Sequence, residues 1–153
     1  MVDRMGSVLS IDYGLKRIGL AISDPLRKFA FPLTVLENKG FTYVLSSIKE
    51  IIKDREIELI IIGIPYNLNS KMGGQNVNSK NDMQETIEKF VEKLQKDIKV
   101  SIKKVDERYS SFLAEENLKE AGLNSKKSKS FVDLEAARLL LEEFLKDGKA
   151  QDI

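Results

Sequence analysis

The stretch VLSIDYGLKRIGLAIS, residues 8–23, decides the fold. Val8 to Asp12 is a short apolar run that ends in a carboxylate, and Arg17 to Ser23 has the character of a second strand. Tyr13-Gly14-Leu15-Lys16 between them has the composition of a turn. The stretch therefore predicts a β-hairpin whose first strand ends in an acidic residue.

Outward from the hairpin, the spacing of apolar residues predicts alternating helices and strands. Leu59 to Ile62 is apolar without alternation, as expected for a strand covered on both faces. Two more strands are predicted near residues 31–36 and 100–105, and helices near residues 41–52, 83–94, 110–121 and 131–145. The residues before Ser7 and after Gly148 are expected to be loose ends. The order β-β-β-α-β-α-β-α-α predicts a single α/β domain, 1–153, with a mixed five-stranded sheet flanked by helices on both faces.

The composition narrows the chemistry. Cysteine and histidine are both absent, which excludes disulfides, thiolate sites, a histidine general base and histidine-bound zinc. Hydrolytic chemistry must then use carboxylates, lysines, hydroxyls or a metal held by oxygen, which suits Mg²⁺ or Mn²⁺. No apolar run has the length of a membrane span and no signal peptide is recognisable, so a cytoplasmic location is expected.

The net charge of +1 does not by itself indicate a nucleic-acid partner. Basic residues do cluster locally, and solvated surface is the simpler interpretation of any one cluster. The clusters would indicate a nucleic-acid partner only if they lie together on one face of the folded protein. The clusters are Lys16-Arg17, Arg27-Lys28, Lys103-Lys104 with Arg108, and Lys126, Lys127 and Lys129.

Carboxylates stand at the predicted ends of strands, where sites of open α/β sheets collect. The first strand ends in Asp12, the last in Asp106-Glu107, and Asp133 opens the final predicted helix. Converging carboxylates would repel one another unless a divalent ion lay between them. Two such ions, about 4 Å apart, can activate water and stabilise the leaving oxygen in phosphodiester cleavage.

Each acid also has a plain structural interpretation. Asp12 before Gly14 fits turn chemistry, and Asp106 and Glu107 fit surface charge at a strand end. Ser130-Phe131-Val132-Asp133 matches a capping box, in which Asp133 would only satisfy a helix N-terminus. The residues alone favour the cap for Asp133. Alternation along the last strand does not decide whether Asp106 or Glu107 faces the site.

The polar, glycine-rich stretch from Tyr66 to Ser79 predicts a long loop. Its glycines would let the backbone approach a phosphate, and its amide side chains could bind phosphates or bases. A flexible connector is the simpler interpretation, although long loops in small domains are more often functional.

Four blocks of the sequence together resemble the YqgF family, also called RuvX, of nucleases similar to Holliday junction resolvases. The blocks are LSIDYGLKRIGLAISD (9–24), IGIPYNLNSKMGGQ (62–75), VDERYSS (105–111), and Lys129 with DLEAA (133–137). They match, in order, the family patterns D-x-G-x-K-R-I-G-x-A, V-G-L-P-L-N-x-D-G-x-x-G-x-Q, D-E-R-x-[ST]-[ST] and K-x-x-x-D-x-x-A-A. Any one block is weak evidence, whereas the four in order are specific and cover nearly the whole chain.

The resemblance implies an RNase H-like fold and a metal-dependent endonuclease that uses Mg²⁺ or Mn²⁺. Asp12, Glu107 and Asp133 match the catalytic, metal-binding acids, so the metal-ligand interpretation of Asp133 overtakes the cap. The nucleic-acid-binding positions that it implies are Lys16, Arg17, Asn67, Gly74, Gln75, Arg108 and Lys129. The implied substrate is the 5′ end of the small-subunit (16S) ribosomal RNA precursor.

Other interpretations remain. Branched DNA is an alternative substrate, and a two-fold junction would call for a homodimer rather than a monomer. A non-catalytic nucleic-acid-binding module is another, disfavoured by three retained acids. Asp12-x-Gly14 with Lys16 also resembles the phosphate loop of actin-like ATPases, but this chain is too short for their second domain. The departures from the family, at Asn69, Ser70 and Tyr109, bear on substrate contacts and not on the acids.

Overall fold

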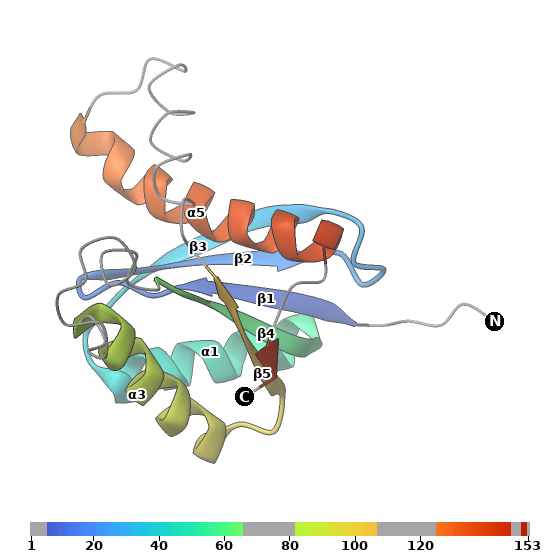
Figure 1. Cartoon of the computed structure of the whole chain (residues 1–153), viewed down its shortest axis with the longest axis horizontal. Coiled ribbons are helices and arrows are strands. Elements are labelled where there is room, and N and C mark those ends of the chain that lie inside the picture. The colour runs from blue at the N-terminus through green and yellow to red at the C-terminus, as the bar shows by residue number, and fades with distance from the viewer. Residues whose placement is uncertain (1–5, 66–81, 107–124, 148–150, 153) are drawn as a thin grey trace, which may run out of the picture.

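The computed structural model describes residues 6–65, 82–106, 125–147 and 151–152, and shows a sheet between two layers of helices (Figure 1). The strands are β1 (Ser7–Asp12), β2 (Arg17–Ser23), β3 (Ala30–Glu37), β4 (Ile57–Ile64), β5 (Ser101–Asp106) and β6 (Gln151–Asp152); the helices are α1 (Phe41–Arg55), α3 (Asp82–Asp97) and α5 (Ser125–Asp147). The hairpin predicted from residues 8–23 is confirmed as β1 and β2. None of the described helices is both long and apolar enough to cross a membrane.

The strand order is β3-β2-β1-β4-β5-β6. β2 pairs antiparallel with β1 and β3, whereas β4 pairs parallel with β1 and β5. The predicted mixed sheet of five strands is thus confirmed. A sixth, two-residue strand pairs antiparallel with β5 through Lys103 and Asp152, so the expectation of a loose end after Gly148 is wrong for Gln151–Asp152.

The two faces of the sheet have different cores. Helices α1 and α3 cover one face, over large buried side chains such as Leu9, Ile11, Ile60 and Ile62. Helix α5 covers the other face alone and packs on the smaller cluster Val8, Ala21, Leu59, Ile61, Val105, Ala137, Leu140 and Leu141. Helices on both faces were predicted and are confirmed.

The boundary of the last helix differs from the prediction. Helix α5 begins at Ser125 and not near Phe131. The stretch from 125 to 147 contains no glycine or proline, so nothing in it breaks a helix. Ser130 therefore lies inside the helix, and the capping box at Ser130–Asp133 is wrong. The helix predicted over residues 110–121 lies outside the described residues.

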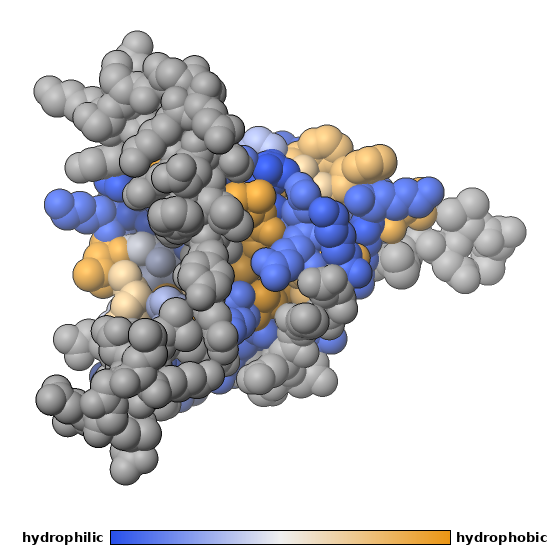
Figure 2. Space-filling view, turned by 45° about the horizontal axis from the view of Figure 1, so that its top comes forward, coloured by the Kyte–Doolittle hydropathy of each residue, from blue (hydrophilic) through white to orange (hydrophobic). Residues whose placement is uncertain are grey.

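The coloured residues on the face that Figure 2 shows are mixed, with hydrophilic side chains interrupted by hydrophobic ones. Exposed large hydrophobic side chains in this part of the chain include Leu26, Phe29 and Phe31 of the β2–β3 connection and β3. Phe131 of α5 is also half exposed.

Candidate active site

Two of the three predicted acids meet at Gly19 of β2. Asp12, the last residue of β1, is the cross-strand partner of Gly19. A β-carbon placed on Gly19 would lie 2.1 Å from the backbone oxygen of Asp133 in α5. Only glycine permits this approach of helix to strand. Residue 12 and residue 133 are therefore neighbours of the same glycine although 121 positions separate them.

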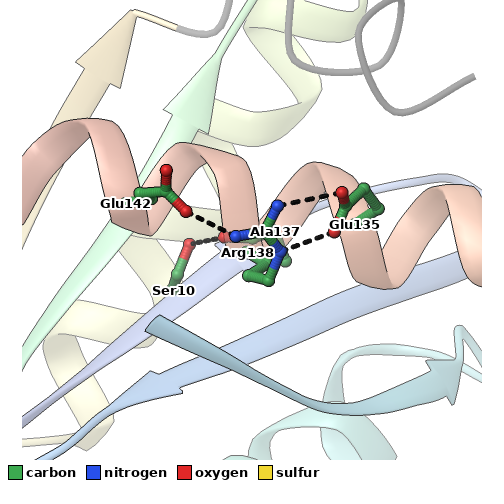
Figure 3. A network of polar contacts seen from close by, with 5 residues as sticks. All are labelled: Ser10, Glu135, Ala137, Arg138 and Glu142. Atoms are coloured by element: carbon green, nitrogen blue, oxygen red, sulfur yellow. Dashed lines mark hydrogen bonds and ion pairs between the residues drawn. The ribbon is translucent and has the colours of Figure 1, made fainter. Parts of the chain in front are cut away.

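The side chains of β1 show which face the site occupies. Ser10 is fully buried and its Oγ donates a hydrogen bond of 2.9 Å to the backbone oxygen of Ala137 (Figure 3). Asp12 is two residues further along the strand, and Asp133 is four residues back along the helix. Each step covers roughly 6 Å, by the rises of strand and helix. Both carboxylates therefore lie on the α5 face, at the carboxyl end of β1.

Asp133 forms an ion pair with another predicted site residue. The Nε of Arg17 donates to Oδ2 of Asp133 at 2.6 Å, with 33% of the arginine side chain and 21% of the aspartate side chain exposed. Arg17 lies two residues before Gly19 and so faces the same side of the sheet. The side chain of Asp133 is thus engaged by a cation from β2 and does not cap a helix.

Asp106 lies on the opposite face from Asp12. Along β5, Ile102 packs in the α1–α3 core and Lys104 is 4.0 Å from Glu88 of α3, whereas Val105 packs under α5. Alternate side chains of a strand point to the same face of the sheet, so Asp106 lies on the face of Ile102 and Lys104. This alternation directs the Asp106 side chain away from the face that carries Asp12 and Asp133, whereas Glu107 lies outside the described residues.

The remaining predicted residues divide into two groups. Lys16 is exposed in the β1–β2 turn, next to Arg17, and Lys129 lies within α5. The residues outside the described part of the chain are Glu107, Asn67, Gly74, Gln75 and Arg108. Within the described ranges, no three acidic side chains gather as a metal cluster. The structure thus brings together Asp12, Asp133 and Arg17, and leaves Glu107 as a prediction.

Three residues that support the site were not singled out from the sequence. Gly19 and Ser10 fix the distance between β1, β2 and α5. A glycine inside a predicted strand can indicate that another backbone approaches closely, and Gly19 offered that signal in the sequence. Arg138 binds Glu135 through Nε and a terminal nitrogen, at 2.6 and 2.9 Å, and also binds Glu142 (Figure 3). The hydrogen bonds that Arg138 donates to Glu135 raise the pKa of Arg138 above its usual value, against the effect of burial. Spacings of three and four residues were the signal for this network.

The fold of this protein is similar to that of solved Holliday junction resolvases. The fold matches the Thermus thermophilus RuvC structure in complex with a Holliday junction substrate, with a TM-score of 0.58 and 14% identity, over 97% of this chain and 99% of that one. A Fowlpox virus resolvase, solved with Holliday junction DNA, matches with a TM-score of 0.50 and 11% identity, over 92% and 97% of the chains. These likenesses show an RNase H-like fold, as predicted.

The family model described as "RuvX: Holliday junction resolvase" matches residues 6–147, and the chain belongs to this family. A relative from Maridesulfovibrio salexigens is 41% identical over 138 residues, which are 90% of this chain and 96% of that protein. A relative from Endomicrobium trichonymphae is 37% identical over 92% and 96% of the chains. Both carry the name "Putative pre-16S rRNA nuclease".

Proposed function

We propose that this protein is a metal-dependent nuclease that hydrolyses phosphodiester bonds in ribosomal RNA precursors, at the site formed by Asp12 and Asp133. The observation that carries the proposal is that residues Asp12 and Asp133 both lie next to Gly19, Asp12 as its cross-strand partner and Asp133 through its backbone. The names of the relatives support the pre-16S substrate, and with it a cytoplasmic location.

The donor set fits a hard divalent ion. Asp12 and Asp133 offer only oxygen, and Mg²⁺ and Mn²⁺ prefer such ligands. We expect Glu107 to complete the set, because it belongs to the VDERYSS block that matches the family's second acid. When bound, the metal would polarise the phosphate and activate water.

Arg17 and Lys16 give the site its cationic side. The ion pair at 2.6 Å holds the Asp133 carboxylate in place next to Gly19 and offsets its charge. Lys16 precedes Arg17 in the chain and is exposed, so its side chain is accessible to a phosphate. We propose that these two side chains orient the nucleic-acid backbone while the acids hold the metal.

A second candidate substrate is branched DNA, which the description of the matching family favours. A four-way junction has two-fold symmetry and needs two sites, so its cleavage would require a homodimer. Sedimentation of the protein with and without junction DNA distinguishes the two substrates, since cleavage of precursor RNA makes no such demand.

The test is cleavage of 5′-extended 16S precursor RNA, in Mg²⁺ and in Mn²⁺, by the parent and by Asp12→Asn. We expect the variant to lose at least about a thousandfold in rate, because a metal ligand is removed. Asp106→Asn is the matched control, since it removes the same charge at the end of β5 on the opposite face. Full cleavage by Asp12→Asn would sink the proposal.

Metal binding is measured separately by calorimetry. Asp133→Asn should reduce Mn²⁺ affinity sharply while circular dichroism shows an intact fold. Unchanged Mn²⁺ affinity would assign Asp133 to structure alone and favour a nucleic-acid-binding module without catalysis.

A further inference from the structure

A cavity of about 290 Å³ lies on the other face of the sheet, at the same end as Asp12. Its walls come from the end of β1, the connection that leads into α1, and helix α3. The residues that the following argument uses are Tyr13, Asn38, Phe41, Lys89, Phe90 and Lys93. The volume is at the lower limit of small-ligand pockets, about 300 Å³, and so suits one nucleotide-sized group.

The floor of the cavity is aromatic. The rings of Tyr13 and Phe90 are 4.7 Å apart between centroids and tilted by 40°, and Phe41 meets Phe90 edge-on at 6.0 Å. Phe90 is buried and belongs to the core, whereas Tyr13 and Phe41 are half-buried and line the cavity. Such half-exposed rings are surfaces on which a nucleobase can stack.

One wall is cationic. Lys89 and Lys93 are one helical turn apart on α3 and both line the cavity. The ammonium group of Lys93 lies 5.6 Å from the centre of the Phe41 ring. Glu85 is 3.4 Å from Lys89, but both side chains are more than half exposed and this pair is screened by solvent. A phosphate next to a base stacked on the floor would therefore meet two lysines.

The opposite wall is fixed by hydrogen bonds. The side-chain nitrogen of Asn38 donates to the backbone oxygen of Gly14 at 2.9 Å and to the hydroxyl of Tyr13 at 3.2 Å. Its oxygen accepts from the backbone nitrogen of Gly40 at 3.3 Å. The Tyr13 ring is thus held in position before any ligand arrives, which lowers the cost of binding.

Asp12 and Tyr13 connect the cavity with the proposed metal site. Asp12 is the last residue of β1 and shares the α5 face with Ser10, whereas Tyr13 follows the strand and packs against the α1–α3 core. A nucleic-acid strand that crosses this end of the sheet can reach both. We propose that the cavity binds one nucleotide of a single-stranded segment that flanks the bond cleaved at Asp12, an inference that rests on the proposed function.

Binding is tested without metal, so that it is independent of cleavage. A fluorescein-labelled single-stranded RNA hexamer and an RNA duplex are titrated with the full chain in EDTA, and anisotropy is recorded over a range of salt. Lys89→Gln/Lys93→Gln should weaken hexamer binding by about tenfold and reduce the slope of log K against log salt by about 1.4. Duplex binding should change less than about twofold.

The matched control is Lys49→Gln/Lys96→Gln, which removes two exposed lysines from α1 and α3 away from the cavity. Equal weakening by the two double variants would overturn the proposal, as would failure of the parent to bind the hexamer. A nuclease that cleaves but shows either result keeps the proposed function and loses only this site. A protein that binds the hexamer as expected but never cleaves loses the proposed function and the link of the cavity to a cleaved bond, and keeps only the nucleotide-binding cavity.

Stacking is tested by Phe41→Leu, which keeps an apolar side chain and removes the π-face. Hexamer affinity should fall about fivefold with an unchanged salt slope. Circular dichroism establishes that the variant is folded. Parent-like hexamer affinity in the folded variant would overturn the proposal.

Discussion

The two faces of the sheet are built from side chains of different size. The α1–α3 face is filled by large residues, among them Leu9, Ile11, Ile60 and Ile62, all fully buried. At the centre of the α5 face, β1, β2 and α5 contribute Ser10, Gly19, Ala21, Ala136 and Ala137, with larger residues on either side. Small residues let a helix backbone approach a strand, whereas large ones keep it at a distance.

The difference explains where the acids can meet. Asp12 and Asp133 become neighbours only because the backbone of α5 reaches Gly19 and Ala137 accepts a hydrogen bond from Ser10. The α1–α3 face supplies stability through buried apolar area. The α5 face gives up part of that area and gains a fixed geometry, and the four predictions below test this contrast.

The largest expected effect comes from Gly19→Ala. The added β-carbon would lie 2.1 Å from the Asp133 backbone oxygen, so helix and strand must separate. We expect a loss of about 3 kcal/mol in the free energy of unfolding, together with loss of Mn²⁺ binding. Denaturant unfolding and calorimetry measure the two quantities.

Val44→Ile is the corresponding change on the other face, since it adds one carbon to a buried position of α1. It should cost about 1 kcal/mol and leave Mn²⁺ affinity unchanged. If Gly19→Ala were as stable and as metal-competent as the parent, close approach would not define the α5 face.

Arg17→Gln is expected to have the next largest effect. It removes the cation that binds Asp133 at 2.6 Å, so a divalent ion no longer competes with a positive charge there. Mn²⁺ affinity should rise about fivefold, because roughly 1 kcal/mol of repulsion between the ion and the guanidinium is removed. RNA affinity should fall, because a phosphate contact is lost. Lys16→Gln is the control, because it removes one positive charge from the neighbouring residue and keeps the ion pair of Arg17 with Asp133. An equal gain in Mn²⁺ affinity in Lys16→Gln would show that this ion pair does not affect metal binding.

Most of the fold could be predicted from the sequence because hydrophobic periodicity marks buried strands and amphipathic helices. The hairpin from Val8 to Ser23 and the apolar run Leu59–Ile62 sufficed to predict a mixed sheet with covered faces. The start of α5 could not be predicted, since the lysines at 125–130 favour a helix whereas the serines among them favour caps and turns. The pairing of Gln151–Asp152 with β5 could not be predicted either, because two residues are too few to show a periodic pattern.

The site could be predicted only as a set of residue types. Asp12 and Asp133 carried a motif, but the ion pair of Asp133 with Arg17 joins residues 116 positions apart and is invisible in sequence. The parity that separates Asp106 from Asp12 required the register of β5 against β4. Gly19 was part of the matched block, yet its contact with the Asp133 backbone depends on how α5 packs.

A smaller effect is expected from Ser10→Ala. The variant removes a buried hydrogen bond to the Ala137 backbone oxygen, which should cost about 1 kcal/mol of unfolding free energy. Ser47→Ala, on the α1 side, removes an exposed bond of 3.1 Å to the Tyr43 backbone oxygen and should cost almost nothing. Equal stabilities of the two variants by denaturant unfolding would contradict a special role for the Ser10 contact.

The smallest effect is expected at the opposite end of the sheet, in the β2–β3 connection. Burial alone would raise the pKa of Asp24, but hydrogen bonds from the backbone nitrogens of Phe29 and Lys28, at 2.7 and 2.8 Å, lower it below its usual value of 3.8. A lowered folded-state pKa means that the charged form stabilises the fold above pH 3.8 and that this contribution is lost as the pH falls through the folded-state pKa.

The stability difference between the parent and Asp24→Asn should therefore stay below about 0.5 kcal/mol at pH 6, because solvent screens the charge, and shrink toward pH 3. Thermal unfolding at several pH values measures it, with Asp54→Asn of α1 as the control. Mn²⁺ affinity should be unchanged, since Asp24 lies at the end of the strands away from Asp12. A change in Mn²⁺ affinity would show that the two ends of the sheet are coupled and that the contrast between its faces does not describe the site fully.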